Sequence, residues 1–304
     1  MFSVLYTIIL TYSYAIASLA SYISWSVSTP ATRRFTWFLT VGKALNCLLL
    51  FVWNVVLQPE FLEEIMCLRM HGIASNFSKY EVHLCVCVAI GLIGIISVYN
   101  VHFGIYNMLA FCSPDMEKNL FSAIYLAIFF LVYLLDLTFE FSLVHGSINL
   151  QAFPTENSVV CYTLSSKHVS KYVAISSCVL VGFKAIVATV LLALLRRFLR
   201  KIQTEANKKK VRAVIRTLVI LSLVPTTMAA IPFAAICIWA LCVSSSPALA
   251  LFSNVASYMA MLHYSVLCIA AIFLFEPFRC AFLRIVLRKN VVQAVVIRTT
   301  NVTD

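Results

Sequence analysis

The sequence predicts an all-α membrane protein, built as one bundle of seven transmembrane helices. The first observation behind this prediction is composition, since 62% of the 304 residues are hydrophobic and only 12% are charged. Soluble domains have about 45–50% apolar and about 25% charged residues, so this composition cannot supply a water-soluble surface. The second observation is a series of apolar segments of transmembrane length, and the third is the uneven distribution of basic residues between them.

Seven apolar windows are each long enough to cross roughly 30 Å of hydrocarbon as a helix, which takes roughly 20 residues. Each window is apolar on all faces, as expected of a helix in lipid. Six of the eight prolines lie in the gaps, where a missing backbone N–H costs least. The predicted spans are Phe2–Trp25, Phe35–Leu57, Val82–Tyr106, Leu120–Val144, Tyr172–Leu195, Thr217–Cys242 and Ala248–Phe275.

These windows predict one seven-helix domain over residues 1–276 and a tail over residues 277–304. The first window lacks a preceding basic segment and is too long for the apolar part of a signal peptide, so we interpret it as a retained span. No internal repeat of the kind found in many transporters is visible.

Lysine and arginine are concentrated in alternate gaps. The gaps after the first, third and fifth windows, together with the tail, hold seventeen of these residues, whereas the other gaps hold four. Cytoplasmic loops of membrane proteins carry the excess of Lys and Arg. The amino terminus is therefore predicted to lie outside the cell and the tail inside.

No sequence pattern indicates metal, cofactor or catalytic chemistry. The eleven cysteines form no C-x2-C pair with accompanying histidines. No constellation of facing nucleophile, base and acid residues is visible, so we expect neither an enzyme nor a cofactor. The seventh window has no lysine for a retinal Schiff base. The basic residues lie in the gaps, which favours the lipid bilayer over nucleic acid as their partner.

Ionisable residues inside the windows are the candidates for ligand contact, because a charge in hydrocarbon is costly unless it faces protein or water. Asp136 and Glu140 are four residues apart and share one face in the outer part of the fourth span. Lys184 in the fifth span could be their counter-ion. Interhelical pairing is the alternative role, and Lys43 near the inner face could instead snorkel. His263 in the seventh span is a further candidate, with a hydrogen-bonded interior role as its alternative.

The predicted outer loops contain a candidate disulfide and a candidate glycosylation site. Cys161 in the second outer loop could pair with Cys67 or with Cys85, and Cys67 is slightly favoured because Cys85 lies inside an apolar window. Asn76 begins a glycosylation sequon on the predicted outer side, whereas the sequon at Asn301 lies on the inner side and should stay unused.

A strongly basic linker joins the fifth and sixth windows. It could bind anionic lipid, and it could also dock an acidic cytoplasmic partner such as a G protein. The sixth window contains Pro225 and Pro232, which loosen the helix and could let it pivot; a static kink is the alternative. The basic residues are Arg196, Arg197, Arg200, Lys201, Lys208, Lys209, Lys210, Arg212 and Arg216.

The start of the tail shows the spacing of a short amphipathic helix. After Pro277, apolar residues recur at Phe278, Phe282 and Ile285 with arginines between them, which predicts a helix lying on the inner leaflet. Cys280 is a candidate for palmitoylation, and a free thiol is the alternative.

Several short features, taken in order, resemble the nematode serpentine chemoreceptors, particularly class H and its relatives in the Str-like superfamily. The resemblance spans nearly the whole chain. Its pieces are Thr29-Pro30 followed by Trp37, Pro59 in the first outer loop, Cys161 in the second, Pro225 with Pro232, and Pro277-Phe278-Arg279, which is similar to that family's Pro-Tyr-Arg. One departure is Tyr99-Asn100-Val101-His102, which stands where rhodopsin-like receptors carry Asp-Arg-Tyr and class H often carries Glu-Asn-Arg.

The resemblance implies the helix bundle of the G-protein-coupled receptors in the plasma membrane, often the ciliary membrane, of sensory neurons. It also implies detection of a small odorant or pheromone-like molecule and signalling through a heterotrimeric G protein. A small seven-helix transporter or channel is the alternative function. The receptor predicts ligand-dependent nucleotide exchange on a Gα subunit, and the transporter predicts substrate flux without one.

Overall fold

The computed structural model describes residues 2–29, 33–62, 67–112, 122–148, 153, 155–162, 223–242, 246–274 and 276–287, with nine isolated positions between 179 and 220. These residues are mostly helical. The helices are α1 (Phe2–Ser26), α2 (Arg33–Phe51), α3 (Lys79–Cys112), α5 (Ala123–Gly146), α8 (Ile231–Cys242), α9 (Pro247–Leu274) and α10 (Glu276–Leu287). Short helical segments are η1 (Val52–Leu57), η2 (Ile73–Asn76) and η3 (Thr226–Ala230), and the strands are β1 (Pro59–Phe61), β2 (Cys67–Met70) and β3 (Val159–Cys161).

Five helices among these residues are long and apolar enough to cross a membrane: Val4–Ser26, Thr36–Leu57, Lys79–Tyr106, Ile124–Gly146 and Pro247–Leu274. They correspond to the first four predicted windows and the seventh. Leu223–Ile236 is a shorter apolar helix within the sixth window. The fifth window, 172–195, lies almost entirely outside the described residues.

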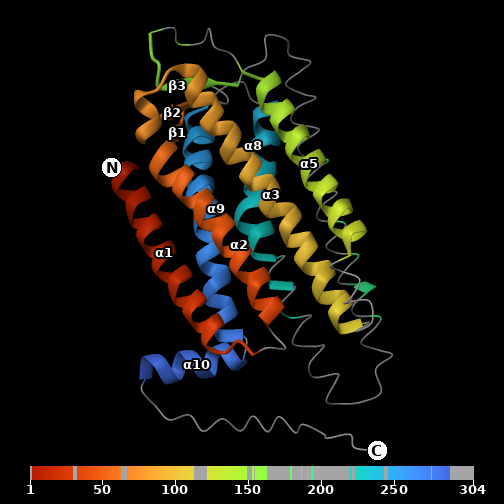
Figure 1. Ribbon diagram of the computed structural model, residues 1–304. Helices are drawn as coiled ribbons and strands as arrows, with labels where there is room; N and C mark the ends of the chain where they lie inside the picture. Colours follow the sequence, from red (N-terminus) through yellow and green to blue (C-terminus); the bar gives the residue numbers. More distant parts are fainter. Residues whose placement is uncertain are drawn as a thin grey trace, which may run out of the picture.

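Spatial neighbours follow chain order. α1 packs on α2, α2 on α3 and α3 on α5, while α8 packs on α9 and α9 returns to pack on α1 (Figure 1). The strands lie at one end of the bundle, called here the sheet end, and α10 lies across the opposite end, called the α10 end (Figure 1). Because α9 contacts α1, the first and the last long helices of the described residues lie side by side.

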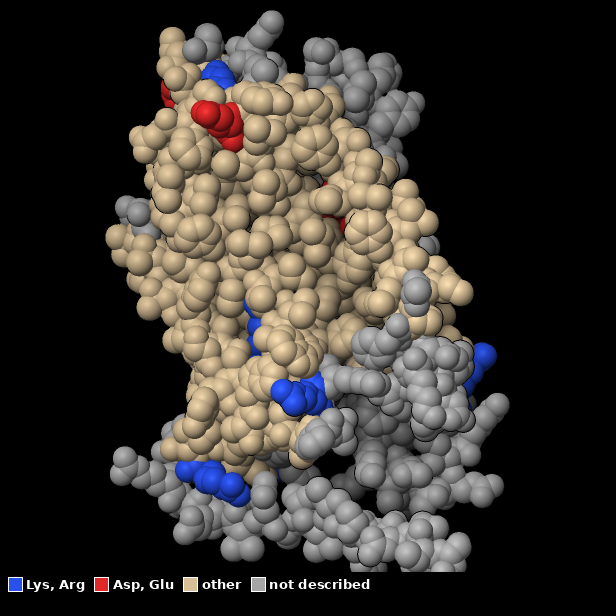
Figure 2. Space-filling view, in the orientation of Figure 1, with Lys and Arg blue, Asp and Glu red and all other residues tan. Residues whose placement is uncertain are grey.

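The sides of the bundle are apolar and exposed. Ile124 and Phe130 of α5 are 75% and 69% exposed, and Leu251 of α9 is 68% exposed. On the face shown in Figure 2, charged side chains gather mainly near the two ends, with a largely uncharged band between them. Such a surface would drive aggregation in water, whereas lipid covers it without cost, as in a multi-pass membrane protein.

Hydrogen bonds between side chains join α1 and η1, the segment that continues α2, to α9. The Trp53 indole N–H donates to Ser257 Oγ at 2.9 Å, and the Ser265 hydroxyl donates to Ser13 Oγ at 2.8 Å. All four side chains are buried. In hydrocarbon no water can replace these partners, so the bonds help to fix how the three helices pack.

Lys43 of α2 bonds the neighbouring helix α1. Its ammonium group donates to the Ala20 carbonyl and to Ser24 Oγ, each at 2.9 Å. Both acceptors belong to α1, so Lys43 takes the alternative role of an interhelical link, between α1 and α2.

A small antiparallel sheet, absent from the sequence prediction, covers part of the sheet end. Its strand order is β1-β2-β3, with Glu60 opposite Arg69 and Cys67 opposite Cys161. The last pair forms a disulfide, which is the pairing that the sequence slightly favoured, and Cys85 is a free thiol in α3. The disulfide therefore ties the loop after α2 to the loop after α5.

The outer edge of β1 is bound to two helices. The Phe61 N–H donates to Asn254 Oδ1 at 2.9 Å, and Asn254 Nδ2 donates to the Phe61 carbonyl at 3.1 Å. The side-chain amide of α9 thus pairs with β1 as a neighbouring strand would. The Tyr6 hydroxyl of α1 donates to the Pro59 carbonyl at 2.6 Å. An edge bonded in this way is not open to strand addition.

Replacing Asn254 with alanine should release β1 from α9 and lower the free energy of unfolding by about 1 to 3 kcal/mol, because two backbone groups lose their partners. Thermal unfolding of the purified chain in nanodiscs measures the effect. Val255→Ala, at a position 47% exposed on the same helix, is the control and should change stability by less. Equal losses for the two variants would mean that the amide bonds contribute nothing specific.

Removing the disulfide with Cys67→Ser should destabilise the chain by about 2 to 5 kcal/mol, because the bond closes a loop of 94 residues. Cys85→Ser should leave the unfolding temperature nearly unchanged. A larger loss of stability for Cys85→Ser than for Cys67→Ser would contradict the pairing of Cys67 with Cys161.

Candidate functional site

The two acidic residues of the fourth span lie against α3. Asp136 and Glu140 are both half-buried on α5. An added Cβ atom at Gly94 of α3 would come within 2.9 Å of Asp136 Oδ2 and would overlap the Glu140 carboxylate. The carboxylates therefore occupy the space that the missing side chain of Gly94 leaves, on the side of α5 that faces protein.

Small residues of α3 make this close approach possible. Gly91, one turn before Gly94, lies against Leu137 of α5 in the same way. Glycines three residues apart share one face of a helix, and in membranes such faces allow two helices to approach closely. The interface of α3 and α5 thus combines an apolar contact at Gly91 with an acidic one at Gly94.

The acidic pair lies toward the sheet end, because it is in the second half of α5, which rises toward that end along the chain (Figure 1). Carboxylates in an apolar setting bind a cation or a hydroxyl or amine donor strongly, since few competing waters are present. Lys184, the counter-ion predicted from the sequence, lies outside the described residues. The structure therefore brings together Asp136 and Glu140 but does not place Lys184.

A second polar group, which sequence reasoning missed, lies nearer the sheet end. His83 of α3 is fully buried, and its Nε2 lies 3.1 Å from Nδ1 of His145 on α5. Its Nδ1 lies 3.2 Å from the Tyr162 hydroxyl, directly after β3. Cys87 Sγ, one turn along α3, is 3.5 Å from His83 Nε2.

We call His83, Cys87, His145 and Tyr162 the His83 cluster. It joins α3, α5 and the residue after β3. Burial raises the pKa of the Tyr162 phenol, so its hydroxyl stays protonated and can donate. Tyr162 follows the disulfide residue Cys161, so its position depends on the sheet. The one available signal in the sequence was a histidine at the outer end of each of two neighbouring spans.

His263 is not part of either group. It is buried in α9, and its Nδ1 bonds the Ala260 carbonyl of the same helix. α9 packs on α1 and α8, whereas the acidic pair lies between α3 and α5. His263 thus lies in the interior and away from the acidic pair, and its contact with a ligand stays a prediction.

The two prolines of the sixth window border an irregular helical segment. Pro225 immediately precedes η3, a π-helix over Thr226–Ala230, and Pro232 is the second residue of α8. π-helical segments inside α-helices occur often at functional sites and at kinks. The helix thus departs from α-helical geometry between the two prolines, and a pivot at this point stays a prediction.

Of the basic linker, only Arg197 and Arg216 are described, and both are exposed. The other seven candidate residues lie outside the described part of the chain. Asn76, at the end of η2, is exposed at the sheet end. Cys280 on α10 is a partly exposed free thiol, and Phe278 and Phe282 of that helix pack against the core.

Within the described residues no group of three or more His, Cys, Asp or Glu side chains is arranged to hold a metal ion. No known protein-family model matches the chain. A search of curated proteins also finds no match. The functional interpretation therefore depends on the geometry of the bundle, the acidic pair and the sequence features.

Substituting Gly94 with alanine should destabilise the chain by about 1 to 2 kcal/mol, because overpacking against two carboxylates outweighs the better helix propensity of alanine. The double variant Gly94→Ala with Glu140→Ala should lose less than the sum of the single losses. Thermal unfolding in nanodiscs gives the three values. Gly146→Ala is the control, since an added Cβ there meets nothing within 4 Å. If the losses of stability of the two single variants simply add in the double variant, the contact between position 94 and Glu140 does not exist.

Proposed function

We propose that this chain is a seven-helix chemosensory receptor of the G-protein-coupled type, with its amino terminus outside the cell. The observation that carries the proposal is the pair Asp136 and Glu140, placed between α3 and α5 toward the sheet end. Intramembrane carboxylates that face protein are costly and mark functional sites. The basic residues of alternate gaps support an extracellular sheet end, and the resemblance to nematode serpentine receptors supports the receptor class.

In this proposal the ligand is a small molecule that carries an amine or hydroxyl donor for the acidic pair. The His83 cluster lies between this pair and the outside, and its three segments border the route of entry from the sheet end. A ligand that binds the carboxylates competes with the contacts they make now, so it changes how α5 packs on α3. The proposed location is the plasma membrane, including the ciliary membrane of a sensory neuron.

The signal reaches the inner side through the sixth span. The π-helix η3 and its two prolines weaken this helix, and the basic linker leads directly into it. A shift of population between two helix positions would move the linker, the proposed docking surface for a heterotrimeric G protein. Spin labels on the inner end of the sixth span should change their separation when an agonist binds.

The departure at Tyr99-Asn100-Val101-His102 affects this mechanism. The Tyr99 hydroxyl donates to the Phe38 carbonyl of α2, and the side chain is buried. α3 continues past this motif to Cys112, beyond the predicted end at Tyr106. The motif therefore lies inside the helix bundle, and the proposed coupling uses the linker and not a charged switch at this position.

Ligand-dependent nucleotide exchange on a Gα subunit tests the proposal, with the full chain expressed in reporter cells against a panel of volatile and water-soluble amines, alcohols and acids. Asp136→Asn and Glu140→Gln should each raise the half-maximal agonist concentration about ten- to hundredfold, because a charge-assisted bond contributes about 1.5 to 3 kcal/mol. Surface expression is measured in parallel.

Glu156→Gln is the matched control, because this carboxylate pairs with Arg69 at the protein surface, 3.1 Å apart. It should leave the response unchanged. Unchanged potency in both acidic-pair variants, at normal surface expression, would exclude the site. Substrate flux into vesicles without any nucleotide exchange would favour the transporter or channel instead.

A further inference from the structure

An apolar groove of about 580 Å³ opens between α2, α3 and α5 on the side of the bundle. Trp37, Val41 and Leu45 of α2 form one wall, and Ile95 and His102 of α3 with Tyr133 of α5 form the other. Its volume lies within the range of roughly 300 to 1,000 Å³ that is usual for ligand pockets. Asp136 and Glu140 are not among its lining residues; Asp136 lies one helical turn beyond the lining residue Tyr133, toward the sheet end.

The two tyrosine hydroxyls in these walls already have partners. The Tyr133 hydroxyl lies 3.5 Å from His102 Nδ1, and the Tyr99 hydroxyl donates to the Phe38 carbonyl. The His102 ring also stacks on Phe129, with ring centroids 3.7 Å apart. The groove therefore presents mainly ring faces and aliphatic surface, which suit a hydrocarbon chain better than a polar molecule.

Arg33, just outside the lining, is on the same face of α2 as two residues that line the groove, and we call this end of the groove its mouth. Arg33, Trp37 and Val41 are spaced by four residues, so they form one stripe along α2. Arg33 is exposed at the start of the helix, and Trp37 and Val41 are 54% and 47% exposed. A molecule that lies along this stripe meets a guanidinium group first and the apolar groove next.

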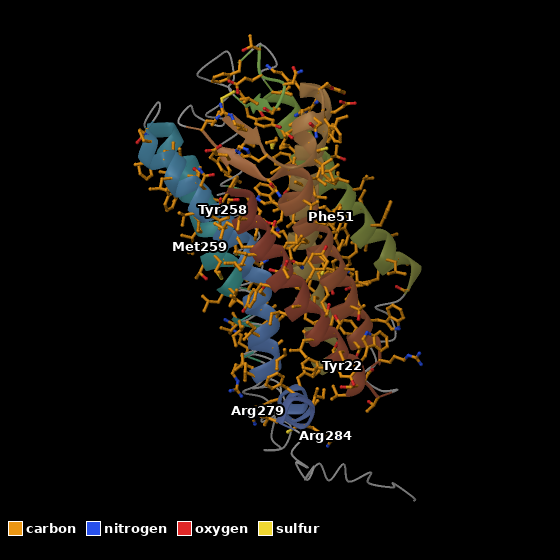
Figure 3. All side chains as sticks on the ribbon, turned by 90° about the vertical axis from the view of Figure 1, so that its left-hand side faces the viewer. Tyr22, Phe51, Tyr258, Met259, Arg279 and Arg284 are labelled. Carbon is orange, nitrogen blue, oxygen red and sulfur yellow. A yellow bond between two sulfur atoms is a disulfide. The ribbon has the colours of Figure 1, made fainter. Side chains whose placement is uncertain are left out.

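Aromatic residues place this mouth at the edge of the hydrocarbon. Trp25 of α1 contacts Trp37 edge to face, with ring centroids 5.4 Å apart, and Tyr22 of α1 is 62% exposed. Figure 3 shows Tyr22 at the same end as Arg279 and Arg284 of α10. Tryptophan and tyrosine concentrate where hydrocarbon meets the polar headgroups, so Arg33 lies at headgroup level.

We propose that this groove binds an anionic glycerophospholipid of the cytoplasmic leaflet. One acyl chain lies between α2, α3 and α5, and the phosphate and anionic headgroup lie at Arg33. The site uses the proposed orientation, in which the α10 end is cytoplasmic, because anionic lipids are concentrated in that leaflet. It does not depend on receptor activity.

Quenching of Trp37 fluorescence by brominated lipids tests the proposal. The full chain is placed in symmetric nanodiscs containing increasing fractions of brominated phosphatidylserine or brominated phosphatidylcholine. The signal of Trp37 is the difference between the unchanged chain and Trp37→Phe. Half-maximal quenching should need about fivefold less of the anionic lipid, the factor that one basic residue contributes at a membrane surface.

Arg33→Gln should bring the ratio of the half-maximal fractions of the two lipids close to one. Arg279→Gln removes an exposed arginine of α10 at the same end and should leave this ratio near five.

Val41→Phe narrows the groove and should reduce quenching by both lipids. Leu48→Phe is the control, because Leu48 is 48% exposed on the same helix but does not line the groove, and it should leave quenching unchanged. Equal quenching by the two lipids in the unchanged chain would overturn the proposal.

Displacement of both brominated lipids by a sterol at low mole fraction would also overturn the proposal, because it would assign the groove to a sterol. Symmetric nanodiscs present the same lipids to both ends, so the result does not depend on orientation. A glycan on Asn301 would contradict the orientation separately, and absence of nucleotide exchange would contradict only the receptor function.

Discussion

The absence of water from the membrane interior is the constraint on which the rest of this structure depends. Any polar atom placed there must find its partner within the protein. Lys43 meets this requirement by bonding α1, and Trp53 meets it by bonding Ser257 of α9. The same partners that satisfy these atoms also help to fix the packing of α2 on α1 and of η1 on α9. Apolar side chains on the outer faces of the helices need no such arrangement, because lipid covers them.

Hydropathy and charge predicted the long helices because those properties act over about twenty residues and need no knowledge of neighbours. The first window, Phe2–Trp25, differs from α1 by one residue. The sheet could not be predicted in this way. β1 and β3 have three residues each, and they are stabilised by partners distant in sequence, such as Asn254. The π-helix η1 at the end of α2 was missed for the same reason.

The candidate site, too, could be predicted only in part from the sequence. The spacing of Asp136 and Glu140 placed them on one face of a helix, but nothing in that spacing indicated that Gly94 would be the surface they meet. His83 and His145 belong to different helices, and their contact depends on how α3 crosses α5. The spacing of polar residues inside a span therefore identifies candidate site residues. Their partners depend on how the helices pack, which one sequence does not reveal.

Asn254 has a consequence for how this bundle can move. α9 carries the amide that holds β1 at one end, and α10 follows it directly at the other. With 28 residues, α9 is about 42 Å long, so one straight element connects the two surfaces of the membrane. Hydrogen bonds join α9 to α1 and to η1, the continuation of α2. We therefore expect these linked helices to move least, and conformational change to involve mainly α3, α5 and the proline-containing helix.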